Sequence, residues 1–597
     1  MDKITDNSCV PSVANDQRSS EGNSFPKKKF QKIRFFFYPF LGKKKNILFV
    51  LLSFFRNFAT VNEKRDMRKY PVGIQSFEKI RHDGYVYIDK TPLVYKMITE
   101  GCPYFLSRPR RFGKSLLVST LAAVFEGRRE LFEAFTTEQG IEQPQLFIAT
   151  TNWKWEKYPV LRFDFSSGDL STIEQLDRLI DFTLSEYEEE YGVKSTMKSD
   201  FNLRMKKIIH AAERKTGKKV VVLVDEYDNF ILHSLGDTEK TTTGRKRFQD
   251  LFGPLKSEDD HLQFVFITGI SKFSQMGIFS KLNNLENISM QSIYEAICGI
   301  SEDELTTTLR PDIELLAERQ GVEYDDMLAE LKRNYDGYHF GRGKADIYNP
   351  FSLVKAFKSG EISNYWFDSA TPSALFEMLA NMPPIDISAI DGTECDASEF
   401  DQPFDSYAAP LPVLYQSGYL TIKSYDREMD AYTLGFPNHE VRTGFAECLF
   451  KYVTHTQNRD DRKRSVLQLA YRRFRRDDVM EPFIEALKVF FAGVPYMIDD
   501  KDEHHFHAML YTLFVSFGAD VVAEDLSAKG RADLTLKMPK GIYIMELKYD
   551  DTAEAALRQI DERGYADKYA LDGRPVTKVG VAFSSKERNI TDWKSVS

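Results

Sequence analysis

One loop, between a short apolar strand and an apolar helix, constrains the fold of this chain most. Tyr104 to Leu106 predicts a buried strand and Leu116 to Phe125 predicts the helix, with Gly113-Lys114-Ser115 between them. In such a loop the backbone N–H groups bind phosphate oxygens, the lysine reaches the β- and γ-phosphates, and the hydroxyl binds Mg²⁺. The general pattern has glycine five residues before Gly113, whereas this chain has Arg108.

A second strand supplies the acidic residues that complement this loop. Lys219 to Val224 is a continuous β-branched run, typical of a strand buried on both faces of a parallel sheet, and it leads into Asp225-Glu226. Ligands of such sheets bind beyond the carboxyl ends of the strands. We expect Asp225 to hold Mg²⁺ through water and Glu226 to orient and deprotonate the attacking water. A helix cap is the alternative role for such an acidic pair when no phosphate loop precedes it.

Two further strands fit the same sheet. Val160 to Phe165 alternates apolar and polar residues, and Leu262 to Thr268 is an apolar run followed by Gly269. In ATPases with an extra strand between the two phosphate motifs, a polar residue at its end senses the γ-phosphate, and Thr268 is placed for that role. An ordinary strand threonine is the alternative interpretation.

Composition limits the class of protein. The chain has 597 residues, which predicts three or four domains, and its 42% hydrophobic and 28% charged residues are typical of globular proteins. The net charge of −9 excludes a generally polycationic chain, so any nucleic-acid contact must be local. The five cysteines form no CxxC pair, which argues against a zinc ribbon or a disulfide framework and favours a cytoplasmic location.

The first 66 residues differ from the rest of the chain. They carry 13 basic and 6 acidic residues, a net charge of +7, whereas the remaining chain carries −16. The apolar run Ile47 to Phe55 is much shorter than the roughly 20 residues that span a bilayer. We expect no stable membrane insertion and interpret residues 1–66 as a disordered extension or a mis-assigned start before Met67. A membrane-surface amphipath is the alternative.

The middle of the chain predicts helices and then a small mixed module. Windows between Ser301 and Asn364 have helical spacing and predict a lid behind the core. Leu411 to Arg442 predicts a helix, a strand, a polar turn and a second strand, which is compatible with a winged helix that either binds DNA or packs domains. The arginines of Arg459 to Asp478 are interleaved with aspartates, so we expect a solvated helix face more than a phosphate contact.

A strand hairpin near the C-terminus brings acidic residues together. Gly530 to Met538 and Gly541 to Tyr549 predict two strands joined by a tight turn at Pro539-Lys540. A hairpin centred there places Asp533 opposite Glu546, and strand alternation puts Lys548 on the face of Glu546. Paired carboxylates repel unless a cation lies between them, and oxygen ligands suit Mg²⁺ or Mn²⁺.

The elements around this hairpin are typical of a known superfamily. A helix with an apolar stripe from Glu503 to Phe517 and then a strand precede it, and a helix over Thr552 to Gly564 and a strand over Val576 to Phe583 follow, which is an αβββαβ order. This order resembles that of PD-(D/E)XK nucleases. Asp533, Glu546 and Lys548 match the D…ExK core, while Glu503 and Gln559 match accessory positions. At these positions we expect Glu503 to position water or a second ion and Gln559 to contact the substrate backbone. An accidental salt-bridge ladder is the alternative when the pattern stands alone.

Seven motifs are spread in order over the chain from Met67 onward: KYPVGIQSFEKI (69–80), YVYIDKTPLV (85–94), FLSRPRRFGKSLL (105–117), VLVDEYDNF (222–230), TGISKFS (268–274), YDGYHF (335–340) and IYNPFSL (347–353). They resemble those of the bacterial AAA-ATPase-like family, whose members typically carry a C-terminal PD-(D/E)XK nuclease-like domain. The family's own phosphate loop also tends to have arginine at the position of Arg108.

Together these features predict an α/β multidomain chain that binds ATP and Mg²⁺ and whose nucleotide state gates a metal-dependent nuclease acting on DNA, with RNA not excluded. The alternative is a non-catalytic ATP-dependent switch or interaction protein, and a homo-oligomer is open in either case. The expected domains are an extension (1–66), an ATPase core (67–300), a helical lid (301–400), a winged-helix and linker region (401–490) and a nuclease-like domain (491–597).

The expected site residues fall into two groups. The nucleotide site comprises Arg110, Arg111, Gly113, Lys114, Ser115, Asp225, Glu226 and Thr268, with Ser115 and Asp225 at the metal and Arg110, Arg111 or Arg245 as an open choice for an arginine finger. The nuclease site comprises Glu503, Asp533, Glu546, Lys548 and Gln559, with Asp533 and Glu546 at the metal.

Overall fold

The strands around the phosphate loop form a parallel sheet, as their β-branched runs predict. A computed structural model describes residues 68–597 apart from 102, 167–169, 195–197, 235–236, 272–283, 343–344, 368–386, 397–409, 454–461 and 493–502. The strand order is β4-β5-β6-β1-β7, and every neighbouring pair is parallel. The strands are β1 (Tyr104–Ser107), β4 (Val160–Asp164), β5 (Val220–Asp225), β6 (Leu262–Gly269) and β7 (Glu286–Asn287).

Strand β6 lies between β5 and β1, which confirms the predicted extra strand between the two phosphate motifs. Because the strands are parallel, their carboxyl ends share one edge of the sheet, and Ser107 and Gly269 are register partners there. Asp225 ends β5 at the same edge.

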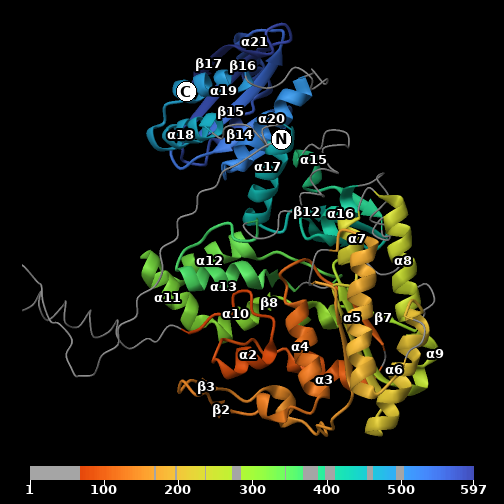
Figure 1. Ribbon diagram of the computed structural model, residues 1–597. Helices are drawn as coiled ribbons and strands as arrows, with labels where there is room; N and C mark the ends of the chain where they lie inside the picture. The colour runs from red at the N-terminus through yellow and green to blue at the C-terminus, as the bar shows by residue number, and fades with distance from the viewer. Residues whose placement is uncertain are drawn as a thin grey trace, which may run out of the picture. The chain divides into compact units, whose positions relative to one another are not determined.

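Helices cover this sheet (Figure 1). Helix α4 (Lys114–Phe125) follows the phosphate loop and packs on β5 and β6, while α5 (Ile173–Tyr191), α6 (Phe201–Thr216) and α8 (Thr238–Phe252) lie side by side. The remaining elements of this half are α2 (Phe77–His82), α3 (Thr91–Glu100), η1 (Arg129–Leu131), β2 (Phe135–Thr136), β3 (Glu142–Gln143), η2 (Phe147–Thr150), α7 (Asn229–His233), α9 (Pro254–Ser257), η3 (Asp259–His261) and η5 (Ser292–Ile297).

The region predicted as a lid is helical where the structure describes it. It contains β8 (Ile300–Ser301), α10 (Glu302–Thr308), α11 (Arg310–Gln320), α12 (Tyr324–Tyr335), β9 (Ile347–Tyr348), α13 (Pro350–Ser359) and α15 (Ile387–Ile390).

The expected helix, strand, turn and strand then follow as α16 (Pro410–Gln416), β11 (Thr421–Asp426) and β12 (Ala431–Gly435). A short strand that the sequence did not predict, β10 (Glu394–Asp396), pairs with β12, and α17 (His439–Val453) comes next.

The C-terminal region has the predicted element order with one addition. Helix α20 (Glu503–Ser516) precedes a five-stranded sheet of order β13-β14-β15-β16-β17, with α21 (Ala553–Arg563) between β15 and β16 and η8 (Asp567–Tyr569) after α21. The strands are β13 (Val521–Ser527), β14 (Gly530–Lys537), β15 (Ile542–Tyr549), β16 (Val576–Ser584) and β17 (Asn589–Val596), of which the sequence did not predict β17.

Two helices that the sequence assigns to a linker pack on this C-terminal sheet. Phe474 of α18 (Arg462–Asp477) lies edge-on to Tyr543, and Phe491 of α19 (Glu481–Phe491) lies edge-on to Phe583. The exposed arginines of α18 flank its buried apolar residues, which agrees with the expected solvated face.

The basic N-terminal segment, residues 1–66, lies outside the described residues, so its interpretation as an extension stays a prediction. Among the described residues no helix combines the length and apolar character that crossing a membrane requires.

His439, the first residue of α17, is a half-buried titratable group of the middle region. Burial lowers its pKa to about 4, and the nearby positive charge of Arg333 acts in the same direction. The folded chain therefore keeps His439 neutral at a pH where the unfolded chain protonates it.

We predict that this histidine makes the folded chain less stable as the pH is lowered. Between pH 6.5 and 4 the unfolded state gains a proton that the folded state does not, so stability decreases as the pH is lowered, by up to about 3 kcal/mol. Thermal unfolding of wild type and His439→Gln at pH 7.5 and pH 5 tests this. The difference between the two proteins should shift in favour of the variant at pH 5, and an unchanged difference would contradict the assignment.

Candidate functional site

The phosphate loop closes directly onto helix α4. Gly113, at φ 93°, is the residue before the helix, and Arg111 also has a positive φ, of 70°. Lys114 is buried, and its ammonium group donates to the carbonyls of Arg108 (3.1 Å) and Pro109 (3.0 Å). The lysine therefore lies within the loop, where it stabilises the loop's own carbonyls.

Arg108 explains why this chain departs from the general glycine pattern. Its guanidinium is buried and donates to the carbonyls of Ser107 (2.9 Å), Ser289 (2.8 Å) and Tyr294 (3.1 Å). It also lies 4.2 Å from the ring centroid of Phe340, and burial lowers its pKa to about 10. The side chain thus ties the phosphate loop to the segment that follows β7.

A cavity of about 490 Å³ opens beside the loop. Four other segments share its wall: the stretch before α2, the start of α13, the residues after β5, and Ser166 after β4. The stretch before α2, the start of α13 and Asn229 lie in family motifs that the sequence showed without assigning them to the nucleotide site, whereas Ser166 and His233 lie outside every such motif. The lining residues are Pro71, Val72, Gly73, Ile74, Gln75, Arg110, Arg111, Gly113, Lys114, Ser115, Leu116, Ser166, Glu226, Asn229, His233, Pro350, Phe351 and Val354.

Asp225 is a buried carboxylate next to the loop. Burial raises its pKa to about 6, while a hydrogen bond from Ser115 and the charge of Lys114 oppose that rise. Its Oδ1 atom has no hydrogen-bond partner among the described residues. A carboxylate oxygen without a partner beside a serine hydroxyl fits the ligand set that Mg²⁺ prefers, so these two residues could hold that ion.

Glu226 and Asp228 shape the loop after β5. Glu226 lines the cavity in a left-handed conformation, φ 49°, a strain that proteins commonly store at functional positions. Asp228 Oδ2 accepts hydrogen bonds from the backbone N–H groups of Ile270 (2.9 Å) and Ser271 (2.5 Å). A Cβ on Gly269 would lie 2.5 Å from Asp228 Oδ1, so glycine is required for this close approach.

The structure does not bring every expected residue to the cavity. Thr268 is fully buried, and its hydroxyl donates to the carbonyl of Leu106 (2.7 Å), so it joins β6 to β1 and is absent from the lining. Arg110 and Arg111 line the cavity, whereas Arg245 lies on α8 and does not. Of the three candidates for an arginine finger, Arg110 and Arg111 therefore lie at the nucleotide cavity of their own chain.

The C-terminal hairpin has the predicted register. Leu534 pairs with Met545 and Thr535 with Ile544, which places Asp533 and Glu546 at the next pair of positions. Asp533 Oδ2 accepts a hydrogen bond from the Leu547 N–H at 2.7 Å, so its carboxylate lies across the end of the ladder beside Glu546.

Glu546 is the most deeply buried acid of this site, with 1% of its side chain exposed. Burial and then the charge of Asp533 raise its pKa to about 7. Its Oε1 atom accepts hydrogen bonds from Lys548 Nζ (3.4 Å) and from the amide of Gln559. Its Oε2 atom has no partner among the described residues, which fits a divalent cation shared with Asp533.

Two accessory positions have different outcomes. Gln559, expected to contact the substrate backbone, instead donates to Glu546 and therefore orients that carboxylate. Glu503 is the first residue of α20, but its side chain lies outside the described residues. On the same helix, His507 Nε2 contacts the carbonyl oxygen of Asp533 at 2.8 Å, a positioning role that its place in an apolar stripe did not reveal.

Two family models match the two domains that hold these sites. A family model described as Predicted AAA-ATPase matches residues 71–279, and one described as PD-(D/E)XK nuclease superfamily matches residues 501–593. An uncharacterized protein in the vnfD 5′ region of Azotobacter chroococcum is 33% identical over 541 residues, which cover 88% of this chain and 98% of the relative. Among solved structures, the ORC2 protein of Aeropyrum pernix in ADPNP-ADP complexes matches 60% of this chain and 93% of its own, with 10% identity and a TM-score of 0.24.

We predict that Arg108→Gly, which restores the general loop pattern, destabilises the protein. Three buried carbonyls would lose a charged donor, at a cost of at least about 3 kcal/mol. Differential scanning calorimetry should show a lower unfolding temperature, with exposed Arg129→Gly as the matched control. A variant as stable as wild type would show that Arg108 does not hold the loop.

Proposed function

The chain belongs to the AAA-ATPase-like family and carries a C-terminal domain of the PD-(D/E)XK nuclease superfamily, and from that premise we propose that it hydrolyses ATP with Mg²⁺ and that its nucleotide state gates a metal-dependent nuclease acting on DNA. One observation carries the proposal. Each domain holds a buried carboxylate, Asp225 or Glu546, with one oxygen that has no partner among the described residues, at the position where its motif places a metal ligand.

The nucleotide lies in the 490 Å³ cavity in this proposal. Its phosphates occupy the loop from Arg110 to Ser115, where the N-terminus of α4 and Lys114 supply positive charge. Apolar side chains on the opposite wall, among them Val72 and Phe351, are suited to cover the base.

Glu226 acts as the general base for ATP hydrolysis. Its carboxylate lines the cavity, and the backbone at Glu226 is fixed by the sharp turn that leaves β5. Asp228 stabilises this turn through the residues after β6, so the base is held on a braced loop.

Asp533 and Glu546 hold the metal of the nuclease site. When bound there, Mg²⁺ or Mn²⁺ supplies a water of lowered pKa and offsets charge on the scissile phosphate. The chain's own part is to hold the two carboxylates in place through Leu547 N–H, Gln559 and the hairpin register. Lys548 lies on the same face and stabilises the negative charge that develops during cleavage.

A continuous series of contacts supports the gating step. The indole N–H of Trp366 donates to the carbonyl of Arg110 in the phosphate loop (3.5 Å), and its backbone N–H donates to Glu440 in α17 (2.8 Å). From the same helix Arg442 hydrogen-bonds to Tyr511 of α20, the helix that carries His507. Movement of the phosphate loop could thus reach the helix that positions Asp533.

We predict separable losses at the ATPase site. Lys114→Ala should lose ATP binding, because its charge at the phosphates is removed, whereas Glu226→Gln should bind ATP and lose turnover. Equilibrium binding of a fluorescent ATP analogue and phosphate release measure the two effects, with exposed Lys154→Ala as the control. If Glu226→Gln hydrolyses ATP at the normal rate, another residue is the general base. Unchanged ATP affinity in Lys114→Ala would refute the assignment of the phosphate loop.

We also predict separable losses at the nuclease site. Asp533→Asn keeps an acceptor for the Leu547 amide but should lose both Mn²⁺ binding and cleavage. Lys548→Ala should still bind Mn²⁺ but cleave about 10²- to 10³-fold more slowly. Isothermal titration with Mn²⁺ and plasmid cleavage measure both, with exposed Lys540→Ala as the matched lysine control.

The nuclease proposal has a clear contrary result. If the wild type hydrolyses ATP but cleaves no plasmid, single-stranded DNA or RNA with Mg²⁺ or Mn²⁺, the chain is an ATP-dependent switch or interaction protein.

A further inference from the structure

A third cluster of ionisable side chains lies at the opposite edge of the parallel sheet from the nucleotide cavity. His210 belongs to α6, Glu258 follows α9, and His261 ends η3 immediately before β6 begins at Leu262. Because β5 and β6 are parallel, the start of β6 lies at the edge opposite to Asp225, where β5 ends. This cluster is therefore separate from both sites described above.

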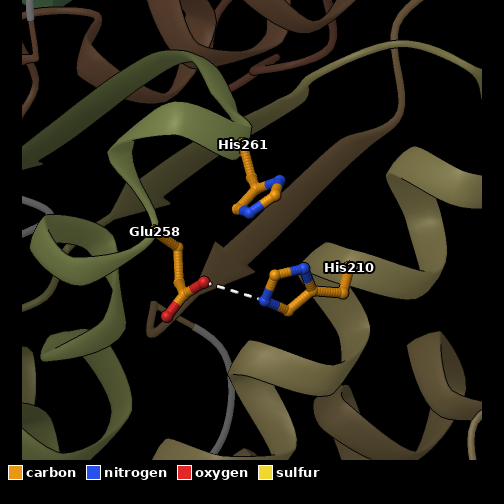
Figure 2. Close-up of side chains that lie close together, drawn as sticks. All are labelled: His210, Glu258 and His261. Carbon is orange, nitrogen blue, oxygen red and sulfur yellow. Dashed lines mark ion pairs between the residues drawn. The ribbon is translucent and has the colours of Figure 1, made fainter.

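The three side chains converge on one point (Figure 2). His210 Nε2 lies 2.8 Å from Glu258 Oε2, and the two imidazole rings meet edge to face with centroids 4.2 Å apart. One nitrogen or oxygen from each residue lies within 4.8 Å of the others. Zinc–nitrogen and zinc–oxygen bonds are each about 2.0 to 2.2 Å long, so two ligands of one ion lie at most about 4.4 Å apart, and only a small adjustment of these side chains is needed for one ion to bind all three.

The contacts around the cluster fix which atoms face inward. His261 Nδ1 contacts Glu213 Oε2 at 2.5 Å, which leaves its Nε2 for the cluster, and Figure 2 shows a ring nitrogen of His261 turned toward the other two residues. Glu258 Oε1 accepts from Ser257 Oγ (3.0 Å) and pairs with Lys206 (3.2 Å), which leaves Oε2. A carboxylate on the outer nitrogen of a histidine is the usual support for a zinc-binding imidazole.

We propose that His210, Glu258 and His261 form a Zn²⁺ site. Two imidazoles and one carboxylate suit zinc better than Mg²⁺ or Ca²⁺, which prefer oxygen ligands alone. Glu258 is buried, whereas the histidines are 38% and 33% exposed, so a fourth position is open to water. The ion would fasten α6 to the turn that starts β6, the strand between the two phosphate motifs.

The test uses the full-length chain with Asp533→Asn and Glu546→Gln, which removes the proposed nuclease metal site, after chelator treatment and without nucleotide. Isothermal titration with Zn²⁺ should show one equivalent that His210→Gln and Glu258→Gln each lose. Glu213→Gln should weaken this binding by about 10- to 100-fold, as removal of a supporting partner does. His82→Gln is the matched control, because His82 is an exposed histidine that pairs with Glu78 at 3.6 Å.

If His210→Gln and Glu258→Gln both bind as much zinc as the parent protein, the proposal is overturned. The cluster then consists of two ion pairs, His210 with Glu258 and His261 with Glu213. If either variant fails to fold, X-ray absorption of the zinc-loaded parent protein decides the matter. Scattering from two imidazoles around zinc would support the site, and zinc without imidazole scattering would refute it.

Discussion

Both proposed sites depend on the burial of a carboxylate. Asp225 and Glu546 each lie on a strand that is buried along most of its length, so water cannot solvate them fully, and their pKa values rise to about 6 and about 7. A buried carboxylate is costly unless a positive charge or hydrogen-bond donors compensate it. Each acid has a lysine nearby, Lys114 or Lys548, yet keeps one oxygen without a partner among the described residues. That imbalance is what a divalent cation would remove.

The sequence could predict these acids because strand patterns carry their own geometry. In a parallel sheet the carboxyl ends share one edge, so a β-branched run that ends in Asp225 places that acid beside the phosphate loop. In the hairpin the turn at Pro539-Lys540 fixes the register, and side-chain alternation then determines which residues share a face with Asp533.

Residues whose role depends on tertiary packing could not be predicted in the same way. Arg108 looked like a departure from a motif, but its guanidinium holds the carbonyl of its neighbour Ser107 and those of Ser289 and Tyr294, which lie in a segment distant in sequence. Thr268 was expected at the γ-phosphate and Gln559 at the substrate backbone. Instead, Thr268 donates a hydrogen bond to the carbonyl of Leu106, and Gln559 donates one to Glu546. Their partners come from other elements, so no local periodicity reveals them.

The central claim is that nucleotide state controls cleavage, and one comparison tests it most directly. Plasmid cleavage is measured with saturating ATP in Glu226→Gln, expected to retain bound ATP, and in Lys114→Ala, expected not to bind it. Coupling free energies between sites commonly change activity or affinity about 5- to 150-fold, so we expect the two rates to differ by at least about 10-fold. Equal cleavage rates in the two variants, both well above that of Asp533→Asn, would show a nuclease that the ATPase does not gate.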